Sequence, residues 1–119
     1  MNTRTTYELQ EVIQPIASLI SKSEKAQQRL KPGMWQHTML RENLRALHLA
    51  FALMSSRTDG PDVPTREDFQ AALRAFADMT TRSEKAQAKF APGTSQHTLQ
   101  RNRLRAFRAA EALISAKLR

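Results

Sequence analysis

The chain repeats itself without a gap. Residues 23–38 read SEKAQQRLKPGMWQHT, and residues 83–98 read SEKAQAKFAPGTSQHT. When residues 5–57 are aligned with the residues 60 positions later, 21 of the 53 positions are identical. A repeat of this length is typical of one supersecondary unit that is used twice. We therefore predict a tandem duplication within a single domain of 119 residues, with units at 5–57 and 65–117 and a linker at 58–64.

Each unit has the apolar spacing of two helices that are joined by a turn. Apolar residues recur at intervals of three and four on both sides of Pro32-Gly33 and of Pro92-Gly93. This is the pattern of amphipathic helices that pack on their neighbours, and proline followed by glycine ends a helix and permits a turn. The pattern predicts an all-α protein, in which two tandem-duplicated antiparallel helical hairpins form an up-down-up-down four-helix bundle.

Helix boundaries follow from shorter signals. Thr5 to Glu8 (TTYE) and Thr65 to Asp68 (TRED) place a hydroxyl three residues before an acid, which predicts a capping box at the start of each unit. Pro15 lies within the first predicted helix and predicts a kink or a break there. In the last helix, Gln100 and Glu111 interrupt the apolar stripe, so we expect this helix to be a weaker core partner.

Composition limits the possible functions. The absence of cysteine excludes disulfides, thiolate nucleophiles and cysteine metal sites. The longest apolar run, ALHLAFALM, is too short to cross a bilayer, so we expect a cytoplasmic protein without a membrane span. The formal net charge of +8 attracts polyanions without choosing among them.

Polar residues occupy core-facing positions next to both predicted turns. A hairpin that turns near Pro32 places Gln27 beside His37 and Glu24 beside Arg41. Both turns of an up-down-up-down bundle lie at the same end, so we expect the polar residues of the two units to converge. This polar set consists of Ser23, Glu24, Gln27, His37, Ser83, Glu84, Gln87 and His97.

We interpret the polar set as a hydrogen-bonded layer that fixes helix register. The layer predicts that His37 and His97 point into the hairpins and contact Gln27 and Gln87, or the serines of the set, directly or through water. A ligand or ion site is the alternative. A metal site is disfavoured, because each helix offers a single histidine. A hydrolase site is also disfavoured, because the sequence contains no glycine-rich turn that could carry a nucleophile. We expect neither a metal ion nor a cofactor.

Arginines recur along the second helix of both units at intervals that place them on one face. One interpretation is a surface that tracks phosphate groups. The other, which we favour for Arg41 and Arg101, is pairing with Glu24 and Glu84 across each hairpin. We expect Arg103, Arg105 and Arg108 to be exposed. The arginine stripe consists of Arg41, Arg45, Arg101, Arg105 and Arg108.

Met34 and Trp35 stand in the first turn, where the second unit has Thr94 and Ser95. An apolar pair in a polar turn indicates a contact surface or a tryptophan that folds back over the end of the bundle, and we slightly favour the second. The sequence as a whole favours a non-enzymatic helical interaction or regulatory protein that binds a protein partner or itself. The alternative is a nucleic-acid-binding protein that uses the arginine stripe, and an enzyme with a small ligand or metal ion at the polar set ranks third.

Overall fold

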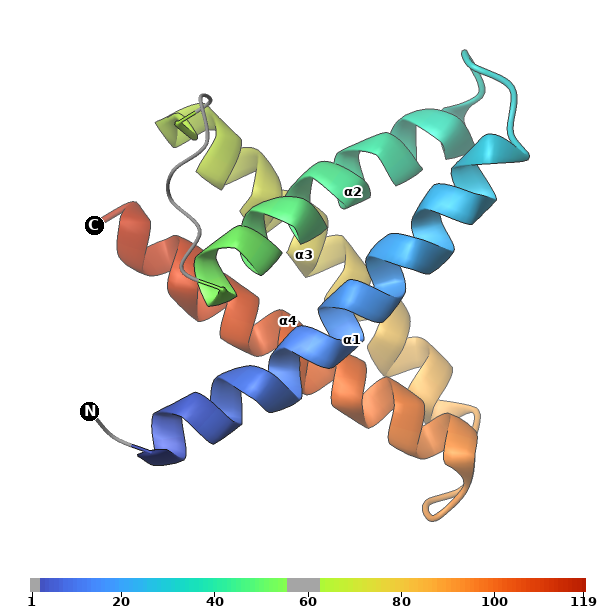
Figure 1. The fold of residues 1–119 in the computed structure, drawn as a ribbon. Helices are drawn as coiled ribbons and strands as arrows, with labels where there is room; N and C mark the ends of the chain where they lie inside the picture. Colours follow the sequence, from blue (N-terminus) through green and yellow to red (C-terminus); the bar gives the residue numbers. More distant parts are fainter. Residues whose placement is uncertain (1–2, 56–62) are drawn as a thin grey trace.

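A computed structural model describes the backbone of residues 3–55 and 63–119 and the side chains of residues 9–55 and 63–119. Within this part, the chain is all-α, and no strand is present. The predicted four-helix fold is confirmed, whereas most of the predicted linker at 58–64 lies outside the described residues, and the tandem duplication stays a prediction. The helices are α1 (Thr3–Gln28), α2 (Trp35–Met54), α3 (Arg66–Ala88) and α4 (Ser95–Lys117) (Figure 1).

Two antiparallel hairpins, α1–α2 and α3–α4, turn in the same way. Gly33 and Gly93 have φ angles of 97° and 91°, in the left-handed region that glycine adopts without strain. The backbone N–H of Met34 and that of Thr94 each donates to the carbonyl three residues earlier, at 3.3 Å and 3.2 Å. The proline–glycine pairs therefore end the helices where the sequence predicts.

The predicted helix starts have different outcomes. Thr65 and Asp68 form the predicted capping box, in which Thr65 Oγ1 accepts from the N–H of Asp68 at 3.2 Å and the N–H of Thr65 donates to Asp68 Oδ2 at 2.8 Å. The corresponding prediction for Thr5 is wrong, because α1 already begins at Thr3 and Thr5 lies inside the helix.

Helix α1 also continues through Pro15, so the predicted break into two shorter helices is wrong. Val12 and Ile16, on either side of the proline, are both buried in the core. Their packing holds the helix together across the missing backbone donor, since tertiary contacts supply most of the stability of a helix in a protein.

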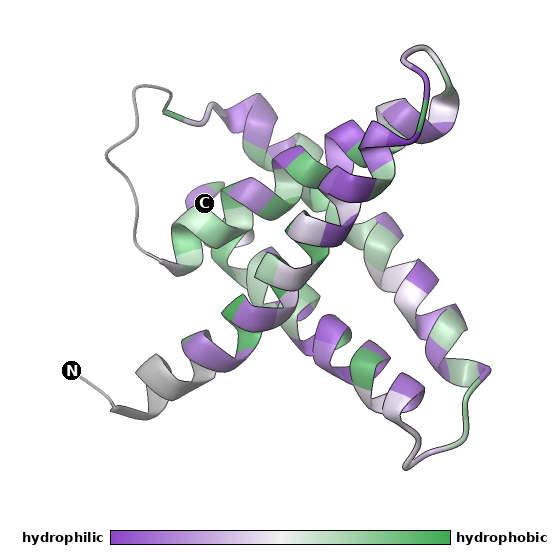
Figure 2. Cartoon of the chain, turned by 45° about the vertical axis from the view of Figure 1, so that its right-hand side comes forward, coloured by the Kyte–Doolittle hydropathy of each residue, from purple (hydrophilic) through white to green (hydrophobic). Residues whose placement is uncertain are grey.

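The hairpins cross near their middles to form an X (Figure 1), and the molecule is broad and thin, at 42 × 39 × 23 Å. Helix α1 packs on α2 and α4, and α3 packs on α4 and α2. Figure 2 shows hydrophilic residues recurring along the helices, as expected for amphipathic helices that bury one face. Buried residues recur 60 positions apart, as the pairs Val12 and Ala72, Ile16 and Phe76, Leu44 and Leu104, Ala46 and Ala106, Leu47 and Phe107, Ala50 and Ala110, and Met54 and Ile114.

The polar residues in the stripe of α4 do not reduce the number of residues that this helix buries. Gln100 is itself buried, with no hydrogen-bond partner for its Oε1 atom among the described residues, and Glu111 accepts a hydrogen bond of 3.1 Å from Thr80 Oγ1 on α3. The residues 60 positions before Thr80 and Glu111 are Ile20 and Phe51, which pack at the edge of the core. A hydrogen-bonded pair thus occupies in the second hairpin the positions of two apolar residues in the first. Among the described residues α4 buries six and α2 five, so the expected weaker packing of α4 is wrong.

Candidate functional site

Two grooves lie between helices of different hairpins. The first groove, between α1 and α4, has a volume of about 420 Å³, and the second groove, between α2 and α3, one of about 1030 Å³. The first groove is lined by Glu11, Val12, Gln14, Pro15, Ser18, Leu99, Asn102, Arg103 and Arg105. Each of these residues has its counterpart 60 positions away in the second groove, namely Ala71, Ala72, Arg74, Ala75, Asp78, Met39, Glu42, Asn43 and Arg45.

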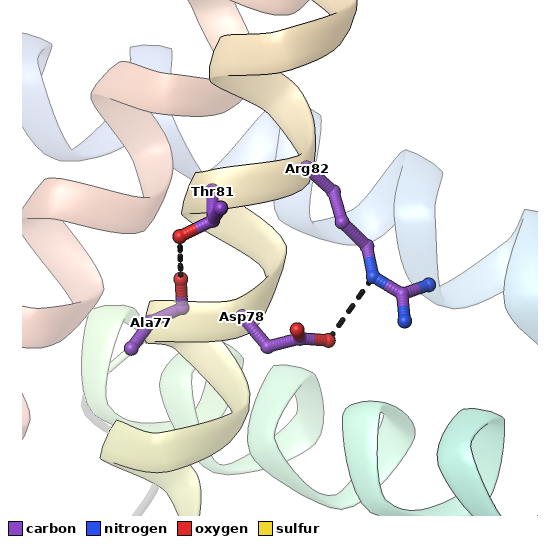
Figure 3. A network of polar contacts seen from close by, with 4 residues as sticks. All are labelled: Ala77, Asp78, Thr81 and Arg82. Atoms are coloured by element: carbon purple, nitrogen blue, oxygen red, sulfur yellow. Dashed lines mark hydrogen bonds and ion pairs between the residues drawn. The ribbon is translucent and has the colours of Figure 1, made fainter.

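The second groove has an acidic residue on α3 where the first has a serine. Asp78, the counterpart of Ser18, lies 3.2 Å from the Nε atom of Arg82 one turn later on the same helix (Figure 3). Figure 3 also shows Thr81 donating to the carbonyl of Ala77 at 3.1 Å. Because about half of each charged side chain is exposed, the pair adds little stability, but it partly neutralises the carboxylate beside the groove.

The first groove contains two arginines in different environments. Arg105 donates from Nη2 to Glu11 Oε2 at 2.9 Å, and both of these side chains are more than half exposed. Arg103 is half-buried, and this burial lowers the pKa of its guanidinium because the cation loses solvent. Of the two ion pairs found among the described side chains, neither includes Arg103. Its counterpart in the second groove, Asn43, is uncharged.

The polar set does not form one cluster. Since the hairpins cross, their turns lie at separate corners of the molecule (Figures 1 and 2), and the expected convergence is wrong. His37 and His97 are half-buried, but among the described side chains no direct hydrogen bond joins them to the glutamines or serines of the set, so that layer is not formed by direct contacts. The remaining members of the polar set lie next to one or the other of the two turns and differ in exposure. Ser83 is buried, Ser23, Gln27 and Gln87 are half-buried, and Glu24 and Glu84 are exposed.

The arginine stripe is exposed, and the three of its residues that line a groove are divided between the two grooves. Arg41 and Arg45 line the second groove, and Arg105 lines the first. Among the described side chains, Arg41 and Arg101 form no ion pair with Glu24 and Glu84, so the expected pairing is wrong. The crossing of the hairpins gives Arg105 its partner on α1 instead, in the other hairpin. The stripe residues, Arg41, Arg45, Arg101, Arg105 and Arg108, are all exposed.

Among the described side chains, two neighbouring apolar residues are exposed at the turn of the first hairpin. Trp35 is 66% exposed and Met34 is 40% exposed, so the interpretation that Trp35 folds back over the bundle is wrong. Met34 is also the N-cap residue of α2 and provides no side-chain hydrogen bond, whereas its counterpart Thr94 accepts from the N–H of His97 at 3.2 Å. The apolar residue thus occupies a position where the other hairpin gains stability from a cap.

Sequence reasoning missed most of the first groove. Gln14 and Ser18 share a face of α1 with Glu11, and Asn102 lies one turn before Arg105 on α4. This spacing shows that the residues of α1 share one helix face and that those of α4 share another. The spacing does not show that these two faces lie against each other, because that depends on which helices are neighbours. Arg103 was expected to be exposed and is half-buried.

Within the described residues, no three histidine, aspartate or glutamate side chains lie close enough to hold a metal ion, and no helix has the length and apolarity to cross a membrane. The chain matches no protein-family model, and comparisons with curated proteins and with solved structures found no match. The features that bear on function are therefore the turn of the first hairpin and the two grooves.

Proposed function

We propose that this chain is a non-enzymatic interaction protein that binds a protein partner through the turn of its first hairpin. The observation that supports this proposal is the exposure of Trp35, at 66%, beside Met34. Tryptophan and methionine are enriched in the cores of protein interfaces, and a few large side chains of this kind carry most of the binding energy. The missing cap at Met34 adds support, since a residue kept at a cost in stability is typical of a functional surface. A cytoplasmic location is part of this proposal.

The alternative of nucleic-acid binding has less support. It requires one continuous basic surface, whereas Arg41 and Arg45 share the second groove with Glu42, Asp68 and Asp78. Arg105, in the first groove, is already paired with a glutamate. Mixed charge of this kind is unfavourable for a phosphate backbone.

The test is a pull-down from the native cell, with and without nuclease, using three forms of the protein. Trp35→Ser introduces the residue that the second unit carries at this position, and we expect it to abolish capture of the partner. Val63→Ser removes another exposed apolar side chain, 79% exposed, and serves as the control that keeps the partner. The proposal fails if Trp35→Ser captures the same proteins as the wild type, or if nuclease alone removes them. Size-exclusion chromatography with light scattering then shows whether the captured partner is a second copy of the chain.

A further inference from the structure

The first groove holds a guanidinium that the described side chains leave without a counter-charge. Arg103 lies half-buried between α1 and α4, and its lowered pKa reflects the solvent that the cation has lost. Removing a charge from water is costly unless a partner compensates it. An anion that enters the groove supplies this compensation through charge-assisted hydrogen bonds, which are the strong ones.

Neutral hydrogen-bond donors line the groove together with this cation. Asn102 on α4 and Gln14 and Ser18 on α1 line the same groove, and amide and hydroxyl groups donate to carboxylate oxygens. Pro15 and Leu99 provide apolar surface in the groove, which suits the methylene groups of an acidic side chain and its apolar neighbours. The lining therefore matches a carboxylate on a short aliphatic stem.

The charge of the groove sets the charge of its ligand. Arg103 and Arg105 give two positive charges and Glu11 gives one negative charge, which leaves +1. A single carboxylate neutralises this charge, whereas a nucleic-acid strand brings a series of phosphates and needs a longer basic track. The net charge of +8 on the whole chain also favours approach of an acidic partner.

We propose that the first groove binds a glutamate or aspartate side chain of an acidic segment in the protein partner, with Arg103 as the residue that pairs with the carboxylate. This inference rests on the proposed function, because it assumes a protein partner. It adds a second contact on a different part of the surface from Trp35, and it gives that partner an acidic character.

The residue 60 positions before Arg103 suggests the substitution to test. Arg103→Asn introduces the residue that stands at the equivalent position of the second groove, Asn43, where a helix of the other hairpin accommodates it. Arg108→Asn removes the same charge from an exposed position on the same helix, outside the residues that line either groove. Arg103→Lys keeps the charge but loses the planar fork that matches a carboxylate.

The experiment uses the full chain and a short fluorescein-labelled peptide in which glutamates alternate with leucines, at low ionic strength, with binding followed by fluorescence anisotropy. We expect Arg103→Asn to weaken binding about tenfold, Arg103→Lys about threefold, and Arg108→Asn less than about twofold. In ¹⁵N–¹H spectra of the wild type, the side-chain amides of Asn102 and Gln14 should shift with the peptide. These shifts locate the site even if a variant folds poorly.

Several results would overturn the proposal. Equal weakening by Arg103→Asn and Arg108→Asn means general charge attraction, and equal binding of a peptide with glutamine in place of glutamate means that no carboxylate is recognised. A single-stranded RNA that shifts the amides of Asn102 and Gln14 when the peptide does not assigns the groove to nucleic acid instead. Each of these outcomes leaves the capture through Trp35 unchanged, so failure of this inference differs from failure of the proposed function.

Discussion

The N-cap of α2 offers a direct measurement of what the apolar turn costs. Met34 has backbone angles of φ −75° and ψ 145°, and Thr94, the N-cap of α4, has −79° and 156°. Because these conformations are nearly the same, a threonine at position 34 already has the geometry of a cap. Thr94 accepts from the N–H of His97 at 3.2 Å and donates to the carbonyl of Ala91 at 2.8 Å. We predict that Met34→Thr forms the equivalent two hydrogen bonds, from the N–H of His37 and to the carbonyl of Lys31.

The size of the effect follows from a comparison with alanine. Met34→Ala removes the apolar contacts of the methionine without adding a cap, whereas Met34→Thr removes them and adds one. The free energy of unfolding of the threonine variant should therefore exceed that of the alanine variant by about 1 kcal/mol. This difference corresponds to about 4 °C in Tm for a chain of this size. Thr94→Ala should lower the free energy of unfolding of the wild type by a similar amount.

Urea denaturation followed by far-ultraviolet circular dichroism measures all four proteins. The midpoint should change while the slope of free energy against urea stays constant, because no variant alters the surface that unfolding exposes. The reasoning is refuted if Thr94→Ala is destabilised by about 1 kcal/mol while Met34→Thr and Met34→Ala have equal stability. That result would mean that the two turns are not equivalent in solution.

Three further outcomes follow from the core and the surface. Phe76→Ala should lower the free energy of unfolding by about 3–5 kcal/mol in urea denaturation, since Phe76 is fully buried, and a loss below about 1 kcal/mol would contradict the described core. Thr80→Ile should lower the free energy of unfolding by about 1 kcal/mol, because Glu111 loses its 3.1 Å hydrogen bond. The double variant Thr80→Ile with Glu111→Phe carries the two apolar residues that the first hairpin has at these positions, and it should recover most of this loss in the same assay. Glu11→Gln should change stability by less than about 1 kcal/mol and only at low salt, because its pair with Arg105 is exposed, and a larger loss that persists at high salt would contradict this estimate.

Much of the fold could be predicted from local signals. The capping box at Thr65 and the turns at Gly33 and Gly93 depend on contacts within a few residues, and such contacts are nearly independent of the rest of the chain. The predicted break at Pro15 was wrong for the opposite reason, because the buried neighbours Val12 and Ile16 stabilise the helix across the proline.

The candidate site was less predictable than the helices. The exposure of Trp35 depends on whether any part of the chain reaches back to the turn, and local sequence does not contain that information. The same holds for Arg105, whose partner Glu11 is 94 positions away in the chain. Arg103 becomes half-buried only because α1 lies beside α4.

The sequence by itself determined the four helices, their two turns and the 60-residue period with which buried residues recur. These features follow from periodicity and backbone conformation, which act over a few residues. Only the tertiary structure decided that the hairpins cross, and this crossing separates the polar residues of the two turns and places Arg103 between two helices. The angle between hairpins depends on how side chains from distant segments interdigitate, so it cannot be derived from the spacing within any one helix.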